Sequence, residues 1–171
     1  MAEVLTREEL RARQAPLKES YRDDPGSAEI TLRADGTLEE GIACSVQTGK
    51  AIAEAGLHPG TGGEPGLACS GDMLLQALVA CAGVTMRSVA TSMEIGVTGT
   101  VRAEGDLDWR GTLAIDKETP VGFRDIRLFF DVESDASDEE LATLERLTER
   151  YCVVFQTLNS SPGLSTTLNR I

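Results

Sequence analysis

The sequence has few basic residues and few aromatic side chains. Its 171 residues include 16 Lys and Arg against 28 Asp and Glu, a formal net charge of −12, and aromatic residues make up 4%. Proteins that bind nucleic acids need positive charge for the phosphates and aromatic rings for the bases. The composition therefore excludes a nucleic-acid partner. It also requires the core of a chain of single-domain length to be built from aliphatic side chains.

Long apolar runs are also missing. The longest, Leu74–Val84, is interrupted by Gln76 and falls short of the roughly 18 residues that a membrane span needs. Residues 1–9 show no basic stretch followed by an apolar one, so we expect neither a signal peptide nor a membrane partner. We therefore expect a cytoplasmic protein. Structural disulfides are rare in the cytosol, so the four cysteines need another explanation.

The usual spacing of metal ligands is absent as well. The cysteines Cys44, Cys69, Cys81 and Cys152 form no C-x-x-C pair, and His58 is the only histidine. Because structural zinc sites normally show ligands in close couples, we expect no metal and no other cofactor. A Cys-His-Asp hydrolase would have to use His58, which lies in a Gly-rich loop, and the sequence does not favour it.

The N-terminal residues are expected to form an extension outside the main domain. Thr6 and Glu9 have the spacing of a capping box, which predicts a short helix that Pro16 disturbs. A turn at residues 23–26 then marks a boundary. We expect residues 1–27 to be a helical extension and residues 28–171 to form the domain.

Within the domain, period-two patterns predict strands. The predicted strands are residues 28–34, then, after a hairpin turn at Asp35-Gly36, residues 42–46, and later residues 97–103, 111–115, 124–132 and 164–171. A Gly-rich loop is expected at residues 56–66. Two helices are predicted at residues 70–93 and 137–151, capped by Ser70 and Ser137, and residues 152–158 may form a further helical piece.

The helix predicted at residues 70–93 is apolar on every face before Arg87. Such a helix must be buried by other elements or by a partner chain. Together with the order of strands and helices, this predicts an α+β fold in which antiparallel sheets wrap around a buried central helix.

Each cysteine taken alone has an ordinary interpretation. Cys81 and Cys152 lie in apolar segments and Cys44 alternates with apolar residues, so all three are expected in the core, where free cysteine behaves as a small hydrophobe. Cys69 lies beside the start of a helix, where the dipole could lower a thiol pKa.

Two segments together carry a resemblance to a known family. Residues 71–87 (GDMLLQALVACAGVTMR) resemble the central helix of the OsmC/Ohr family of thiol peroxidases, and residues 151–158 (YCVVFQTL) resemble its second cysteine segment. The strands and the helix between them fall where the family has them. The resemblance covers about residues 28–171 and implies the OsmC-like fold and an intertwined homodimer whose active sites lie at the interface.

The resemblance also implies a chemistry. It assigns to Cys81 the attack on an organic hydroperoxide, giving an alcohol and a sulfenic acid, and to Cys152 the formation of an intrachain disulfide. A small dithiol or a thiol protein would then reduce that disulfide, as part of oxidative stress defence. Family members place a cation beside the first cysteine and hold it with an acid, and the candidates here are Arg33 and Asp72.

Helix geometry constrains the role of Asp72. Nine residues at about 100° each put Asp72 and Cys81 on opposite faces of one helix, with a rise of about 13 Å. Asp72 therefore reaches Cys81 only if the helix breaks or if it acts across to another chain. Asp72 could instead serve only the helix N-terminus, and Arg33 could simply cover the polar face of its strand.

Two departures place the chain in a divergent branch of the family. The hydroperoxide-resistance branch has Glu ten residues before the first cysteine, where this chain has Gly71, and Pro after the second cysteine, where this chain has Val153. The leading hypothesis is a homodimeric thiol peroxidase that prefers apolar hydroperoxides. One alternative is a non-catalytic OsmC-like protein that binds a small apolar ligand at the dimer interface. Another is a purely structural dimer with unreactive core cysteines.

Overall fold

The computed structural model describes residues 6–23, 36–38, 43–47, 52–61, 66–114 and 116–170. The helices are α1 (Arg7–Asp23), α2 (Ser70–Met93), α3 (Trp109–Thr112), α4 (Asp138–Tyr151) and α5 (Val153–Asn159), with a 3-10 turn η2 (Pro59–Thr61). The strands are β1 (Gly36–Leu38), β2 (Ala43–Gln47), β3 (Ile52–Gly56), β4 (Ala68–Cys69), β5 (Thr98–Asp106) and β6 (Asp125–Glu133). One sheet has the order β1-β2-β3-β4, and β5 and β6 form a second, two-stranded sheet.

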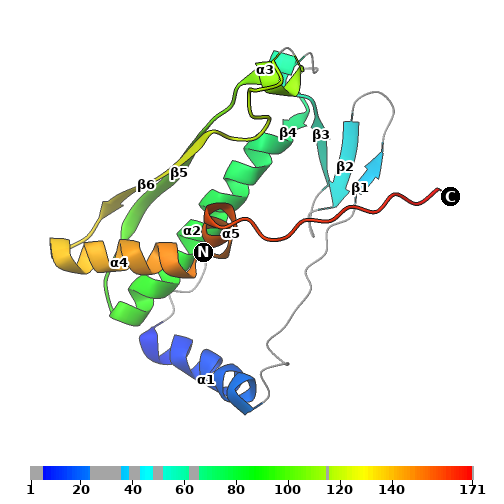
Figure 1. The fold of residues 1–171 in the computed structure, drawn as a ribbon. Coiled ribbons are helices and arrows are strands. Elements are labelled where there is room, and N and C mark those ends of the chain that lie inside the picture. Colours follow the sequence, from blue (N-terminus) through cyan, green and yellow to red (C-terminus); the bar gives the residue numbers. More distant parts are fainter. Residues whose placement is uncertain are drawn as a thin grey trace.

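Helix α2 is the centre of the fold, as the sequence predicts (Figure 1). The hairpin of β5 and β6 runs along one side of it, and α4 crosses it (Figure 1). Its buried residues recur at every fourth position, Leu78, Ala82, Met86 and Ala90, so they form one stripe along the helix. Apolar side chains of β5, β6, α4 and α5 pack against this stripe in two adjoining clusters.

The remaining faces of α2 are less well covered. Val84 is 73% exposed and Leu74 is 38% exposed, although both lie in the most apolar part of the sequence. By length and composition α2 could even cross a membrane, with a mean hydropathy of 1.5 over 18 residues. The packing of α2 against β5, α4 and α5 instead makes it the core helix of a globular domain.

Several predicted elements are confirmed. The central helix occupies residues 70–93, but Cys69, whose side chain makes no capping bond, takes the N-cap position predicted for Ser70. Ser137 and Glu140 form a full capping box at the start of α4, with the Ser137 Oγ accepting from the Glu140 N–H. The predicted strands near residues 97–103 and 124–132 pair as β5 and β6.

The prediction of a strand at residues 111–115 is wrong for the residues described there. The carboxylate of Asp108 accepts a hydrogen bond from the Arg110 N–H at 3.1 Å, and this cap starts the short helix α3 instead. The predicted closing strand is also wrong, because residues 161–170 have no regular secondary structure and are exposed. Leu164 and Leu168 are 89% and 98% exposed, so an alternating pattern without a strand edge to pair with does not make a strand.

The N-terminal region differs from the prediction in three ways. Gly36 pairs with Val46 in β1 and β2, so it does not lie in the predicted turn, and the strand predicted at residues 28–34 lies outside the described residues. Strand β3, which the sequence did not indicate, pairs with both β2 and β4. Helix α1 begins at the predicted capping box but continues through Pro16, which removes one backbone hydrogen bond without ending the helix.

Candidate functional site

Cys81 and Cys152 meet where α2 is covered by the start of α5. Cys81 is half-buried on α2, one turn after Leu78, and Cys152 is only 1% exposed. Both belong to the cluster around Leu78 and Ala82. The predicted pair of cysteines, 71 positions apart in the sequence, is thus brought together by the fold.

The local conformation of Cys152 explains this placement. Cys152 is at once the C-cap of α4 and the N-cap of α5, with extended dihedrals of φ −74° and ψ 108°. Its N–H donates to the carbonyl of Thr148 at 2.9 Å, and its carbonyl accepts from the Gln156 N–H at 2.9 Å. Two helices therefore join at one residue, and the first N–H groups of α5 have no partner within that helix.

These N–H groups act on the Cys81 thiol. Burial raises its pKa, but hydrogen bonds from the Val154 N–H, the Cys152 thiol, the Val153 N–H and the Thr85 hydroxyl outweigh burial, and the pKa of Cys81 is lowered. A lowered pKa means a larger thiolate fraction at a given pH, and the thiolate is the reactive form. The lowered pKa makes Cys81 the better candidate for the nucleophilic member of the pair.

Cys152 is shifted in the opposite direction. Burial raises its pKa most, the Phe155 N–H lowers it, and both the hydrogen bond to Cys81 and the negative charge on Cys81 raise it. The Cys152 thiol therefore ionises less readily than the Cys81 thiol, to which it is hydrogen-bonded. The two cysteines are chemically different in the way that an attacking and a resolving thiol need to be.

Sequence reasoning missed two of these groups. Thr85 lies one helical turn after Cys81, and that i, i+4 spacing could have indicated its hydroxyl as a donor. The second is the Val153 N–H, which exists because this chain has Val where the family that it resembles has Pro, a residue without an N–H. The departure after the second cysteine therefore adds a donor to the site.

We expect Thr85→Val to slow alkylation of Cys81. The variant loses the hydroxyl donor, which raises the pKa of Cys81 toward its ordinary value, so at a pH below that value less thiolate is present. The rate of alkylation by iodoacetamide should fall about two- to tenfold and reach its half-maximum at higher pH. Peptide mass spectrometry over a pH series measures both quantities. Thr85→Ser keeps the hydroxyl and is the matched control, and equal rates in the parent and both variants would contradict the assigned hydrogen bond.

Of the other two predicted site residues, Asp72 is not brought to Cys81 within the chain. Asp72 is exposed in the first turn of α2. Because this helix is unbroken, Asp72 and Cys81 are separated along it as the sequence predicts. Arg33 lies outside the described residues. Cys44 pairs with Leu38 and Ala55 through the backbone of β2, and Cys69 precedes α2. Among the described residues no group of His, Cys, Asp and Glu side chains is arranged to hold a metal ion.

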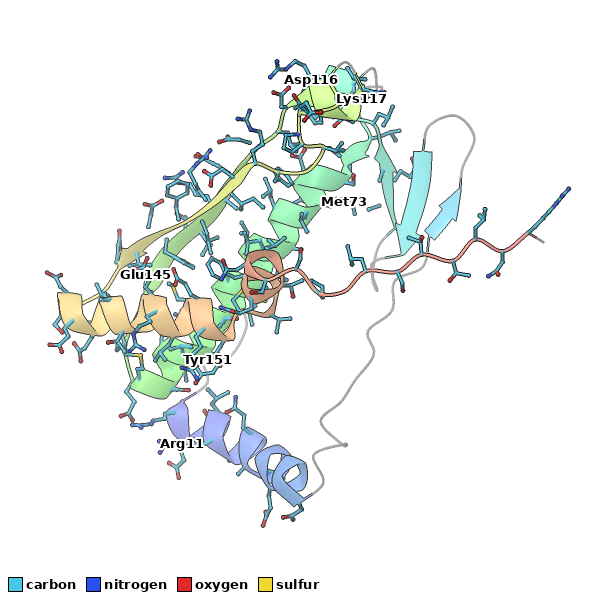
Figure 2. All side chains as sticks on the ribbon, viewed as in Figure 1. Arg11, Met73, Asp116, Lys117, Glu145 and Tyr151 are labelled. Atoms are coloured by element: carbon cyan, nitrogen blue, oxygen red, sulfur yellow. The ribbon has the colours of Figure 1, made fainter. Side chains whose placement is uncertain are left out.

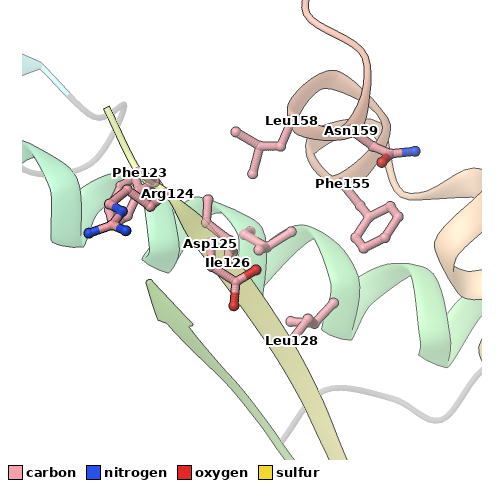
Figure 3. Close-up of a pocket in the computed structure, with 9 residues that line it drawn as sticks. Phe123, Arg124, Asp125, Ile126, Leu128, Phe155, Leu158 and Asn159 are labelled. Atoms are coloured by element: carbon pink, nitrogen blue, oxygen red, sulfur yellow. The ribbon is translucent and has the colours of Figure 1, made fainter. Parts of the chain in front are cut away.

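A cavity of about 410 Å³ is lined by Leu78 and Phe155, which pack in the same cluster as Cys152, and by both apolar and polar residues, the polar ones being Arg124, Asp125 and Asn159. Figure 3 shows Ile126 and Leu128 from β6 facing Phe155 and Leu158 from α5 across this space. Phe155 connects the cavity to the thiols, because its side chain lines the cavity while its N–H donates to Cys152. A molecule in the cavity would therefore lie beside Phe155, whose N–H lowers the pKa of Cys152.

Comparisons with known proteins agree on the fold. Residues 63–167 match the family described as OsmC-like protein. An OsmC-like protein from Mycoplasma pneumoniae aligns with a TM-score of 0.65 at 17% identity, covering 78% of this chain and 90% of that chain. An organic hydroperoxide resistance protein from Elizabethkingia anophelis aligns with a TM-score of 0.62 at 17% identity, covering 78% and 91%. No curated protein matches the sequence. At such identities the structural neighbours show the fold alone.

Proposed function

The chain belongs to the OsmC-like family, and on this premise we propose that it is a thiol-dependent peroxidase that reduces organic hydroperoxides to alcohols. One observation carries the proposal: Cys81 and Cys152 are hydrogen-bonded, with the pKa of Cys81 lowered and that of Cys152 raised. The name of the Elizabethkingia anophelis neighbour, an organic hydroperoxide resistance protein, supports the same substrate class.

The reaction balances with the two thiols and one external reductant. The Cys81 thiolate attacks the terminal oxygen of the hydroperoxide, the O–O bond breaks, and the alkoxide takes a proton and leaves as the alcohol. Cys81 becomes a sulfenic acid. The sulfur of Cys152 then attacks the sulfur of Cys81, a disulfide forms, and the sulfenic oxygen leaves as water. A dithiol or thiol protein returns two electrons and two protons and restores both thiols.

The electrostatics of Cys152 support this order of events. While Cys81 is a thiolate, its charge and its hydrogen bond both raise the pKa of Cys152. Both influences end when Cys81 is oxidised to the neutral sulfenic acid, whereas the Phe155 N–H still favours the Cys152 thiolate. Cys152 thus becomes easier to ionise at the step in which it must attack.

The cavity beside the pair offers the body of a hydroperoxide an apolar wall of Ile126, Leu128 and Leu158, and Arg124, Asp125 and Asn159 line it as well. The same cavity also suits the alternative of a non-catalytic protein that binds a small apolar ligand. Only the redox state of the thiols after exposure to peroxide separates the two hypotheses.

Asp72, Arg33 and the homodimer stay predictions. Asp72 could serve Cys81 only from a second copy of the chain, since one unbroken helix keeps them apart. The exposure of apolar residues around the pair favours such a second copy, with Val84 at 73%, Val153 at 70% and Tyr151 at 60%.

The test counts free thiols by alkylation and mass spectrometry before and after one equivalent of cumene hydroperoxide. We expect the loss of two thiols and a mapped bond between Cys81 and Cys152, because sulfenic acid condenses with a neighbouring thiol. The bond should not form in Cys81→Ser. A folded protein that keeps all its thiols would refute the peroxidase and favour ligand binding. Thiols that react only after denaturation would favour the structural dimer.

A further inference from the structure

A second cavity, of about 360 Å³, lies at the other end of α2 and is unlike the first. Its walls include the rings of His58, Trp109 and Phe123 and the carboxylates of Asp72 and Asp106. His58 and Trp109 are stacked, with ring centroids 5.0 Å apart and an interplanar angle of 22°. In a chain with one Trp and four Phe, two of these scarce aromatics line one cavity with two carboxylates.

Glycines at two positions let the rings take these places. A Cβ on Gly105 would lie 2.5 Å from Phe123, and a Cβ on Gly60 would lie 2.8 Å from the Trp109 Nε1, both too close for any side chain. The orientation of His58 is held as well, because its Nδ1 accepts a hydrogen bond from the Gly60 N–H at 2.9 Å. The absence of a side chain at Gly60 and Gly105 therefore leaves the space that the rings of Trp109 and Phe123 occupy.

The charge of the cavity is negative. Asp106 pairs with Arg127, whose hydrogen bond lowers the pKa of that carboxylate, so its charge is largely offset. Asp72 forms no ion pair among the described residues, so no basic side chain described there offsets its carboxylate. The N-terminus of α2 lies nearby, and the helix dipole contributes about half a positive charge there at most. This is smaller than the negative charge of one carboxylate.

From these observations we propose that the cavity walled by Asp72, Phe123 and Trp109 binds a compact organic cation. Aromatic faces attract cations through their quadrupoles, a carboxylate supplies the opposite charge, and the combination is typical of sites for quaternary and alkyl ammonium groups. Within one chain Cys81 does not line this cavity, and cation binding there is measured without peroxidase activity, although Asp72 is also the acid predicted to serve Cys81 of a second copy.

The test uses the full chain and choline as the probe. Trp109 is the only Trp in the sequence, so its fluorescence and its indole N–H resonance report on this cavity alone. We expect choline to change both signals in a saturable way. The neutral isostere 3,3-dimethylbutan-1-ol, which has the same shape without the charge, should change them little.

Two variants locate the binding. Asp72→Asn should weaken choline binding about fivefold, the effect of losing one exposed charge pair, and Phe123→Leu should weaken it about twofold or more because the ring face is lost. Glu145→Gln is the matched control, because it removes the same charge from an exposed position on α4, remote from the cavity (Figure 2). Far-UV circular dichroism checks that each variant is folded.

The proposal is overturned by any of three results. Choline and its neutral isostere could act equally, or Asp72→Asn could bind choline as well as Glu145→Gln does. Inorganic phosphate could shift the indole resonance where choline does not, which would mean that the helix N-terminus governs the cavity and that it takes anions.

Discussion

The rate at which Cys81→Ser consumes hydroperoxide should be about a thousandfold or more below that of the parent protein. A serine hydroxyl stays protonated in the place where the N–H groups of Val153 and Val154 favour the thiolate of Cys81. The assay measures how fast the concentration of cumene hydroperoxide falls in the presence of a dithiol reductant. Cys44→Ser is the matched control, because Cys44 lies in β2 of the other sheet and should leave the rate unchanged.

Cys152→Ser separates attack from resolution. This variant should still reduce about one equivalent of hydroperoxide, because Cys81 keeps most of its donors, but it should then accumulate sulfenic acid and be oxidised further. A Cys81→Ser variant as active as the parent, or a Cys152→Ser variant that forms no sulfenic acid, would contradict the roles assigned to the pair.

Gly99→Ala should lower the free energy of unfolding by about 3 kcal/mol or more. Gly99 lies in β5 with φ +137°, and a Cβ there would be 2.0 Å from the Asp131 carbonyl oxygen and 2.9 Å from the Val132 Cα. The contacts are with the backbone of the paired strand β6, which cannot move aside without breaking the ladder. Urea denaturation followed by circular dichroism measures the change.

Gly96→Ala is the control for this prediction. Gly96 lies three residues earlier, and a Cβ there would meet nothing within 4 Å. The substitution should change the stability by less than about 0.5 kcal/mol. If the two variants were equally stable, the close approach at Gly99 would not be a constraint on the fold.

The elements that could be predicted are those whose signals lie in their own residues. Helix α2 is marked by a long apolar run, α4 by the capping box of Ser137, and β5 and β6 by strict alternation. The elements that were missed depend on partners far along the chain. Residues 164–170 alternate as a strand does but pair with no strand among the described residues, and Gly111 follows an Asp cap that turns the chain into α3.

The functional site likewise has a part that the sequence indicated and a part that it did not. The pair of Cys81 and Cys152 followed from the resemblance of two segments, but their opposite pKa shifts did not. Those shifts depend on N–H directions at the junction of α4 and α5, which no pattern of residue types contains. The aromatic cavity at Trp109 was also invisible in the sequence, because its walls come from three separate segments.

The sequence by itself determined the central helix, because apolar periodicity and caps act over neighbouring residues. Its resemblance to the OsmC/Ohr family pointed to Cys81 and Cys152 as the candidate thiols. Only the tertiary structure decided that the pKa of Cys81 is lowered while that of Cys152 is raised, and that Asp72 lines a cavity to which Cys81 does not contribute. The physical reason is that a pKa and a binding surface are properties of what surrounds a side chain, and the surroundings of Cys81 and Asp72 are assembled by folding from distant parts of the chain.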